Sequence, residues 1–273
     1  MTAEVMEQPS PVKAAFLVFQ TELDAKHDKY ERIVKLSRDI TIESKRIIFH
    51  LHRITTAESK EVKADLLSSA EKRLRKLQSN MFQVAIEKNF GGNYFQAIAR
   101  ELQNEDQNQF LRAFTAGLQE YIEALSFYHF LRDGHLTTCA EVDALLEFQG
   151  VAACSPLRVP LVDYLLGIGD IAGEVMRYAI NSVSAGQLDV LDSVADFLKQ
   201  LYAGFSLLGN HVPHRDFSFK LETLRQSLLK VEDAQYTLKL RGSHIPKELL
   251  VEIMSSWRTA PPDLDFTPPA PED

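Results

Sequence analysis

The sequence predicts an all-α fold, an antiparallel bundle of long helices, and two observations carry this prediction. Apolar residues recur at spacings of three and four over long stretches, whereas strands would show alternation. The 12 glycines and 11 prolines gather at intervals between those stretches, as expected for short loops. No repeat of fixed period is present, which disfavours a solenoid.

The longest helix is expected from Val12 to about Ala57, because apolar residues recur there with no Gly or Pro between them. Its length would be about 65 to 70 Å at 1.5 Å per residue. The next helix should end before the Gly91-Gly92-Asn93 loop, and Pro160 suits the first turn of a later one. The further helices are expected at about 62–88, 106–131, 140–148, 160–183, 189–208, 216–241 and 246–257.

The domain organisation is expected to be simple, with one helical domain over residues 11–258. Residues 1–10 lack an apolar pattern, and residues 259–273 are rich in proline and acidic side chains, so both segments are expected to be disordered tails.

Composition limits the class of protein. Hydrophobic residues make up 45%, which is enough for a large core, and the net charge of −8 argues against a whole surface that grips nucleic acid. No signal peptide and no run of about 18 apolar residues is present, so secretion and membrane spanning are not expected. Cys139 and Cys154 have no CxxC partner and are interpreted as free thiols in a reducing compartment.

Acidic residues supply the most informative spacing. Glu120 and Glu123 lie three apart on one expected helix, so both carboxylates can share a face. Asp163, Asp170 and Glu174 are offset by seven and four on another helix, which again aligns them. Carboxylate oxygens suit hard cations such as Mg²⁺ or Mn²⁺, which polarise phosphodiesters and activate water.

Two alternatives stay open at these acids. On spacing alone, salt bridges to Arg112, Arg132 or Arg177, or plain solvent exposure, are the commoner explanation. The glycines at 167, 169 and 173 around Asp170 indicate close approach of a ligand or backbone, or simply tight helix packing. Their spacing is not GxGxxG and no strand precedes them, which excludes a nucleotide loop.

Basic residues recur along one side of the first expected helix and form a candidate phosphate-binding stripe. Asp39 and Glu43 interleave with them, so a solvated charged face is the commoner explanation for this pattern. The candidate RNA-binding residues are Lys35, Arg38, Lys45, Arg46 and Arg53. No GxSxG, HExxH, P-loop or CxxC motif is present.

Five segments together resemble the translin family, in its TRAX (translin-associated factor X) branch. They occur in the family's order and cover roughly residues 14–250, and translin itself is less similar at GLQEYIEA and GDIAGE. The segments are HDKYERIVKLSRDITIESKR (27–46), GLQEYIEALSFYHFL (117–131), VDYLLGIGDIAGEVMRYAINSV (162–183), GFSLLGN (204–210) and LRQSLLKVEDAQYTLKLRGSHIP (224–246).

The resemblance implies a translin-like fold and a catalytic metal, Mg²⁺ with Mn²⁺ as a substitute, held by Glu120, Glu123, Asp170 and Glu174. It implies a hollow hetero-octameric shell with translin that cuts single-stranded or nicked RNA, including silencing passenger strands and transfer-RNA fragments. The expected location is the cytoplasm, with entry into the nucleus left open. Two other readings are a non-catalytic scaffold that stabilises translin and, disfavoured by the acidic charge, a translin-like RNA-binding subunit.

Overall fold

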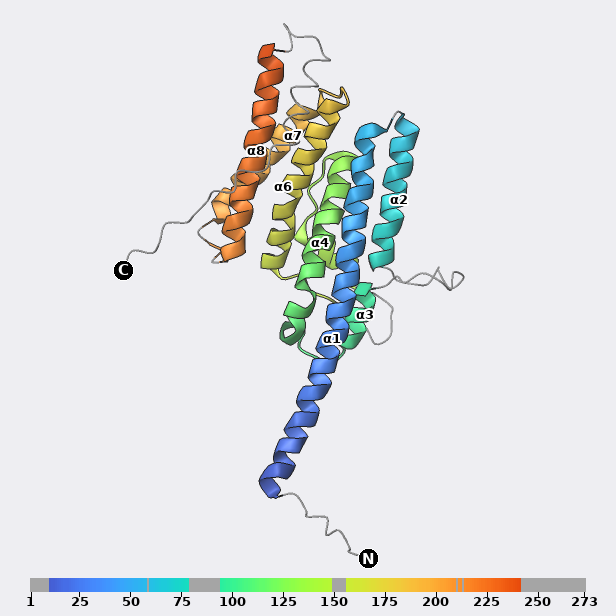
Figure 1. Ribbon diagram of the computed structural model, residues 1–273, viewed down its shortest axis with the longest axis vertical. Helices are drawn as coiled ribbons and strands as arrows, with labels where there is room; N and C mark the ends of the chain where they lie inside the picture. Colours follow the sequence, from blue (N-terminus) through green and yellow to red (C-terminus); the bar gives the residue numbers. More distant parts are fainter. Residues whose placement is uncertain are drawn as a thin grey trace, which may run out of the picture. The chain divides into compact units, whose positions relative to one another are not determined.

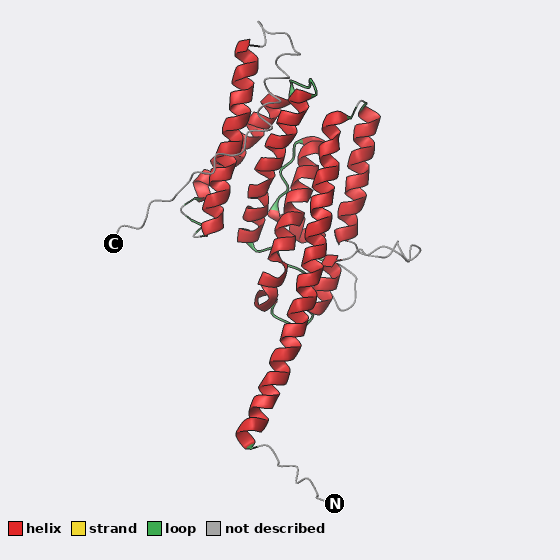
Figure 2. Cartoon of the chain, viewed as in Figure 1, coloured by secondary structure: helices red, strands yellow, loops and turns green. Residues whose placement is uncertain are grey.

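The computed structural model describes residues 10–57, 59–78, 94–148, 156–209, 211–212 and 214–241. Within these ranges the regular structure is helical and contains no strand (Figure 2), which confirms the all-α prediction. No helix in the described ranges is long and apolar enough to cross a membrane. The helices are α1 (Pro11–His52), the 3-10 helix η1 (Arg53–Thr56), α2 (Lys60–Gln78), α3 (Tyr94–Glu101), α4 (Gln107–Asp133), α5 (Cys139–Leu145), α6 (Leu161–Ser184), α7 (Val190–Leu208) and α8 (Arg215–Arg241).

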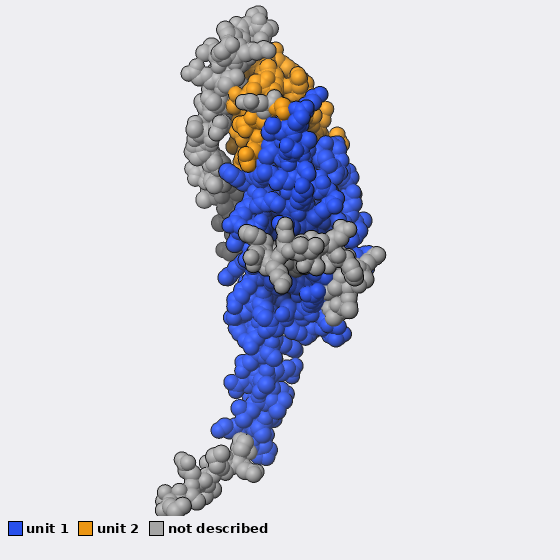
Figure 3. All heavy atoms as spheres, turned by 90° about the vertical axis from the view of Figure 1, so that its right-hand side faces the viewer, with its two compact units in different colours: residues 1–51, 60–171 blue, residues 52–59, 172–273 orange. Residues whose placement is uncertain are grey.

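The contacts within the chain cluster into two compact units (Figure 3). Unit 1 comprises Met1–Leu51 and Lys60–Ile171, and unit 2 comprises His52–Ser59 and Ala172–Asp273. The single domain predicted over residues 11–258 stays a prediction. The last expected helix at 246–257 and the tail at 259–273 lie outside the described residues, as do Cys154 and most of the tail at 1–10.

Helix α1 changes character along its length (Figure 1). Its second half lies among the other helices of unit 1 and buries Ile33, Ile40 and Ile47, which are spaced by seven and so share one face. Its first half projects beyond those helices, and the apolar side chains there remain exposed. Phe16 is 66% exposed and Phe19 is 56% exposed.

Two local predictions differ from the structure. The α-helical part of the first helix ends at His52, and the chain continues to Thr56 as a 3-10 helix, so the predicted end at Ala57 is a few residues late. Helix α3 was not predicted, because an eight-residue amphipathic segment after a glycine pair resembles a loop. Phe95 of α3 is fully buried, and its ring centroid lies 4.9 Å from that of Tyr121 on α4.

Local capping explains the bounds of α4. The side chain of Asp106 accepts a hydrogen bond from the Asn108 backbone N–H at 3.0 Å and so caps the N-terminus. Gly134 follows the last turn with a φ of 73°, a left-handed conformation that glycine adopts without steric cost.

Two glycines bring three helices of unit 1 into close contact. The Gly117 N–H on α4 donates to Ser37 Oγ on α1 at 3.1 Å, and a Cβ at position 117 would lie 2.7 Å from the Ser37 carbonyl oxygen. A Cβ at Gly167 on α6 would lie 2.8 Å from the Gln119 carbonyl oxygen on α4. Packing of helix backbones therefore accounts for the glycine at 167, one of the alternatives left open by the sequence.

In unit 2, α7 packs against α8. The rings of Phe205 on α7 and Phe217 on α8 stack with centroids 5.1 Å apart, and both side chains are buried. This aromatic pair anchors the start of α8 against the end of α7.

The glycine contact predicts opposite effects for two substitutions on α6. Gly167→Ala should destabilise the fold by about 1 to 3 kcal/mol, because the new methyl group would force the backbones of α4 and α6 apart. Gly173→Ala should be neutral or stabilising by up to about 1 kcal/mol, because no heavy atom lies within 4 Å of that Cβ and alanine favours the helix. Thermal unfolding of the two variants measures the difference, and equal melting temperatures would disprove the close contact at 167.

Candidate functional site

Three of the predicted acids share one electrostatic environment in unit 1. Glu120 and Glu123 lie on α4 and Asp170 on α6, while Lys45 reaches them from α1. The Lys45 Nζ lies 2.9 Å from Glu120 Oε1. The hydrogen bond and charge of Glu120, followed by the charges of Glu123 and Asp170, raise the pKa of Lys45. Three carboxylates from two helices therefore act on one ammonium group.

The helix contacts explain why these acids lie near Lys45. Glu120 follows Gly117 by three residues and Asp170 follows Gly167 by three, so each acid lies about one turn from a backbone contact. Residues on the opposite face of α4, such as Tyr121 and Leu125, are buried in the core. The acids are half-buried, so each carboxylate remains within reach of a cation.

Glu174 belongs to unit 2 and has basic partners there. The His52 Nε2 lies 2.5 Å from Glu174 Oε2, and the Arg177 Nη1 lies 2.9 Å from Glu174 Oε1. Burial by itself would raise the pKa of Glu174, but the hydrogen bond from His52 and the charge of Arg177 outweigh it, and the net effect lowers the pKa. Glu174 is thus held as a carboxylate although its side chain is only 13% exposed.

The sequence analysis missed His52 and misjudged the role of Asp163. The available signal for His52 was its position seven residues after Lys45, which places both on one face of α1. Asp163 is 8% exposed and accepts a hydrogen bond from the Gln119 side chain at 2.7 Å. Asp163 therefore joins α4 to α6, a structural role that its alignment with Asp170 did not reveal.

The salt-bridge alternative also finds partial support. Arg177 does pair with Glu174, whereas Arg132 pairs with its neighbour Asp133 at 2.6 Å. The electrostatic partner of Glu120 is instead Lys45, a residue from a different helix.

The donor chemistry of the acids suits a divalent cation, since carboxylate oxygens are the ligands that Mg²⁺ prefers. In this structure, however, the part of the chain that is described holds no group of three or more His, Cys, Asp or Glu side chains arranged for a metal ion. Glu120 is instead paired with Lys45, and Glu174 with His52 and Arg177. The four-acid metal site thus stays a prediction.

The five candidate RNA-binding residues fall into two groups. Arg46 is paired with Glu43 at 2.5 Å, and Lys45 is paired with Glu120. Lys35, Arg38 and Arg53 are exposed and make no ion pair with other described residues. Within the part of the chain that the structure describes, three of the five candidates therefore have no acidic partner.

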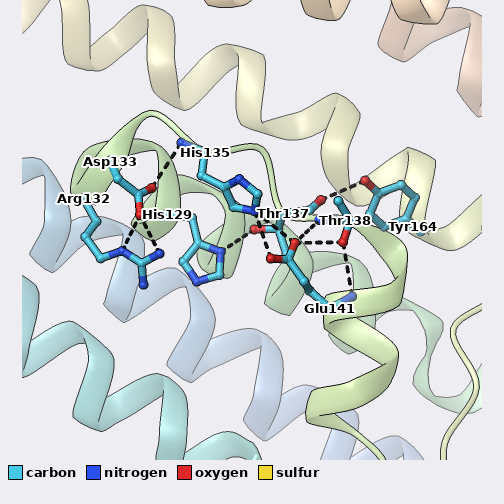
Figure 4. Close-up of polar contacts among 8 residues, drawn as sticks. All are labelled: His129, Arg132, Asp133, His135, Thr137, Thr138, Glu141 and Tyr164. Atoms are coloured by element: carbon cyan, nitrogen blue, oxygen red, sulfur yellow. Dashed lines mark hydrogen bonds and ion pairs between the residues drawn. The ribbon is translucent and has the colours of Figure 1, made fainter.

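A second polar cluster in unit 1 joins the end of α4, α5 and the start of α6 (Figure 4). The Glu141 carboxylate accepts hydrogen bonds from the Thr138 backbone N–H at 2.7 Å and from His135 Nε2 at 3.0 Å. These contacts, with the Thr138 backbone bond first, lower the pKa of Glu141 to about 2. The Tyr164 hydroxyl donates to the Thr137 carbonyl at 2.8 Å and fastens α6 to the same loop. The T-x-x-E spacing signals this capping box in the sequence.

Comparison with known proteins identifies the family to which the sequence belongs. Residues 28–242 match the model of the translin family. The chain is 48% identical to translin-associated protein X of Pongo abelii, with 90% of this chain and 84% of the relative covered. It is 31% identical to the translin-associated protein X homolog of Schizosaccharomyces pombe, over 83% of this chain and 87% of that protein. The chain therefore belongs to the translin family, in the group of translin-associated X proteins.

Two further comparisons are with less similar proteins. Human translin is 27% identical over only 46% of this chain and 54% of its own length. The solved structure titled "Crystal structure of apo-NeC3PO" superposes with a TM-score of 0.57, covers 80% of this chain and 94% of its own, and is 22% identical. The second likeness confirms the translin-like fold.

The Glu141 cluster predicts a pH-dependent contribution to stability. The folded-state pKa of about 2 lies below the ordinary 4.5, so the contribution is fully present above 4.5 and is lost as pH falls toward 2. Glu141→Gln should therefore lower the free energy of unfolding at neutral pH by about 0.5 to 2 kcal/mol, as loss of a cap does. Denaturant unfolding at several pH values should show this difference shrinking below pH 4.5, whereas a constant difference would contradict the assignment.

Proposed function

We propose that this chain is the catalytic subunit of a metal-dependent endoribonuclease assembled with translin. The observation that carries the proposal is the position of Lys45, whose Nζ lies 2.9 Å from Glu120 Oε1 and whose pKa is also raised by the charges of Glu123 and Asp170. The family resemblance adds Glu174, which follows Asp170 by four residues in the sequence, to the proposed set of acids. The proposed substrate is single-stranded or nicked RNA, such as silencing passenger strands and transfer-RNA fragments.

The proposed cofactor is Mg²⁺, for which Mn²⁺ can substitute. When bound, it would neutralise the carboxylates, polarise the phosphodiester and activate water. Glu123 and Asp170 are assigned as direct ligands, and Glu120 and Glu174 as ligands or as groups that hold the attacking water. Because carboxylates alone would repel RNA, cleavage should require the metal.

The proposed partner is translin, in a hetero-oligomer that we take to be octameric and located in the cytoplasm. The names of the relatives support association with translin. The exposed apolar side chains on the first half of α1 also favour a protein partner, because a second helix can cover them. These side chains are Val12, Phe16, Phe19 and Leu23.

A non-catalytic scaffold is the second candidate function, and one observation favours it. Glu120 and Glu174 already have basic partners in this structure, as acids that serve only in packing would. The two functions differ in their response to loss of an acidic charge. In a scaffold, the loss would affect stability or assembly, whereas in a nuclease it would affect RNA cleavage.

Neutral substitutions should separate these functions. Glu123→Gln and Asp170→Asn preserve shape but remove a charge, so we expect kcat to fall by about 100-fold or more, the scale for losing one group that stabilises a transition state. The matched control is Asp163→Asn on the same helix, because the amide oxygen of an asparagine there would still accept the hydrogen bond from Gln119. Cleavage of a labelled single-stranded RNA by the complex with translin, with and without Mg²⁺, measures the effect.

Light scattering should show the same assembled mass for all three variants. Wild-type cleavage rates in Glu123→Gln and Asp170→Asn, or full activity in excess chelator, would exclude the proposed acidic site.

The exposed half of α1 should contribute to assembly. The double substitution Phe16→Ser and Phe19→Ser removes two aromatic side chains that lie 6.1 Å apart, and should weaken binding of translin by roughly tenfold or more. Leu207→Ser is the control, because Leu207 is 79% exposed on α7. Analytical ultracentrifugation with translin measures both, and unchanged assembly of the double variant would show that another surface holds the partner.

A further inference from the structure

One face of α1 alternates basic and apolar side chains. Lys35, Arg38, Ile42, Lys45 and Phe49 are separated by three, four, three and four residues, which places all five on one side of the helix. We call this set the basic-aromatic stripe. At 1.5 Å per residue it is about 21 Å long.

Phe49 is the unusual member of this set. It is 76% exposed although its neighbours Ile47 and Ile48 are buried, and among the described residues it has no aromatic contact. A single exposed apolar side chain is ordinary on a protein surface. Here, however, the ring follows Lys45 by one turn, and Ile42, which is 46% exposed, precedes Lys45 by one turn.

Two of the three basic residues on the stripe are available to bind a ligand. Lys35 and Arg38 are exposed and have no ion-pair partner in the described part of the chain. Two acids of α1 lie close to the stripe: Asp39, which is exposed and follows Arg38 by one residue, and Glu43, which binds Arg46 and Arg73. One turn before Lys35, Glu31 lies 3.3 Å from His27. From Lys35 to Lys45, three cations outnumber the acids Asp39 and Glu43 by one, so a negatively charged ligand along this part of α1 would meet net positive charge.

Lys45 connects the stripe with the acids. Its side chain is 63% exposed, and its Nζ contacts Glu120 at 2.9 Å. A chain of phosphates that follows the stripe would thus pass directly beside Glu120, Glu123 and Asp170.

We propose that the basic-aromatic stripe guides a single-stranded RNA past the acidic site, with phosphates on Lys35 and Arg38 and a base stacked on Phe49. This inference rests on the proposed nuclease function and names the residue that positions the strand. Phosphate contacts are independent of sequence, and any base can stack on an aromatic ring, so the stripe would accept many RNA sequences.

A partner helix is the competing occupant, and the charge pattern disfavours it. The cores of protein interfaces are depleted in charged residues. In the stripe, Lys45 separates the two apolar side chains, and two further cations precede them. The exposed first half of α1, in contrast, presents four apolar residues without such interruption on its own stripe.

The experiment uses the complex of the full chain with translin and a short fluorescein-labelled oligouridine, in chelator so that binding does not depend on cleavage. Phe49→Ala should weaken binding by roughly 5- to 140-fold, the range for removing one stacked base. Phe49→Trp should retain the affinity, and Phe219→Ala, which removes a ring that is 53% exposed on α8, should leave it unchanged. With an abasic oligomer of equal length, the wild-type complex and Phe49→Ala should bind equally.

RNA sites on translin could hide a loss of binding at Phe49, so a second measurement reports on position 49 alone. The tryptophan introduced by Phe49→Trp should be quenched by oligouridine and not by the abasic oligomer, after subtraction of the wild-type signal from Trp257 and from the partner. Lys35→Gln combined with Arg38→Gln should weaken both probes and reduce the salt dependence of binding.

Three results would overturn the proposal. The first is unchanged oligouridine binding by Phe49→Ala together with an unquenched signal from the Phe49→Trp reporter. The second is an equal loss of affinity of Phe49→Ala for oligouridine and for the abasic oligomer. The third is dissociation of the Phe49→Ala complex in light scattering, which would make Phe49 a subunit contact. Failure of the nuclease proposal looks different, because base-dependent binding would persist without any Mg²⁺-dependent cleavage. Mg²⁺-dependent cleavage that persists together with one of these three results would retain the nuclease proposal and reject the stripe.

Discussion

The backbone contacts of α4 with α1 and α6 are the constraint on which the rest of unit 1 depends. A side chain at position 117 or 167 would collide with a carbonyl oxygen of the neighbouring helix, so only glycine permits this spacing. Each glycine costs helix stability, and the Ser37 hydrogen bond to the Gly117 N–H offsets part of that cost at one crossing. The close approach sets the distance between the acids on α4 and Asp170 on α6.

Acids held close to one another repel, and in this structure the positive charge of Lys45 reduces that repulsion. Half-buried carboxylates repel one another and lose hydration, so they require a positive neighbour. The long side chain of Lys45 extends from α1 to Glu120, and the charges of all three acids raise its pKa. The same requirement for positive charge is what makes a divalent cation a chemically reasonable occupant.

Sequence reasoning predicted the parts of the fold that depend on periodicity. The predicted helices over 106–131, 160–183, 189–208 and 216–241 differ from α4, α6, α7 and α8 by only a few residues at their ends, because apolar spacing and caps act locally. Helix α3 was missed because its eight residues gain their stability from tertiary burial of Phe95 and Ile98 against neighbouring helices.

The site was predictable only in part. Spacing aligned Glu120 with Glu123 and Asp170 with Glu174, since helix periodicity determines which positions share a face. It could not show that Asp163 faces Gln119, or that His52 binds Glu174 across 122 positions of sequence, because such pairings arise from tertiary packing. The family resemblance supplied the choice of acids that spacing alone left open.

The overall charge of −8 is compatible with the proposed binding of RNA, because the basic residues have two roles. Some pair with acids of the protein, and others are exposed and available to phosphates. Arg46 and Arg73 are bound to Glu43, and Arg75 to Glu71, so these guanidinium groups neutralise acids of the protein. Lys35 and Arg38 are exposed without such partners among the described residues, and they lie on the face that leads to the acidic site. Electrostatic attraction between exposed charges decays over about 10 Å at 0.1 M salt. An RNA phosphate beside α1 would therefore respond to the charges next to it, those of Lys35, Arg38 and Asp39, more than to the net charge of the whole chain.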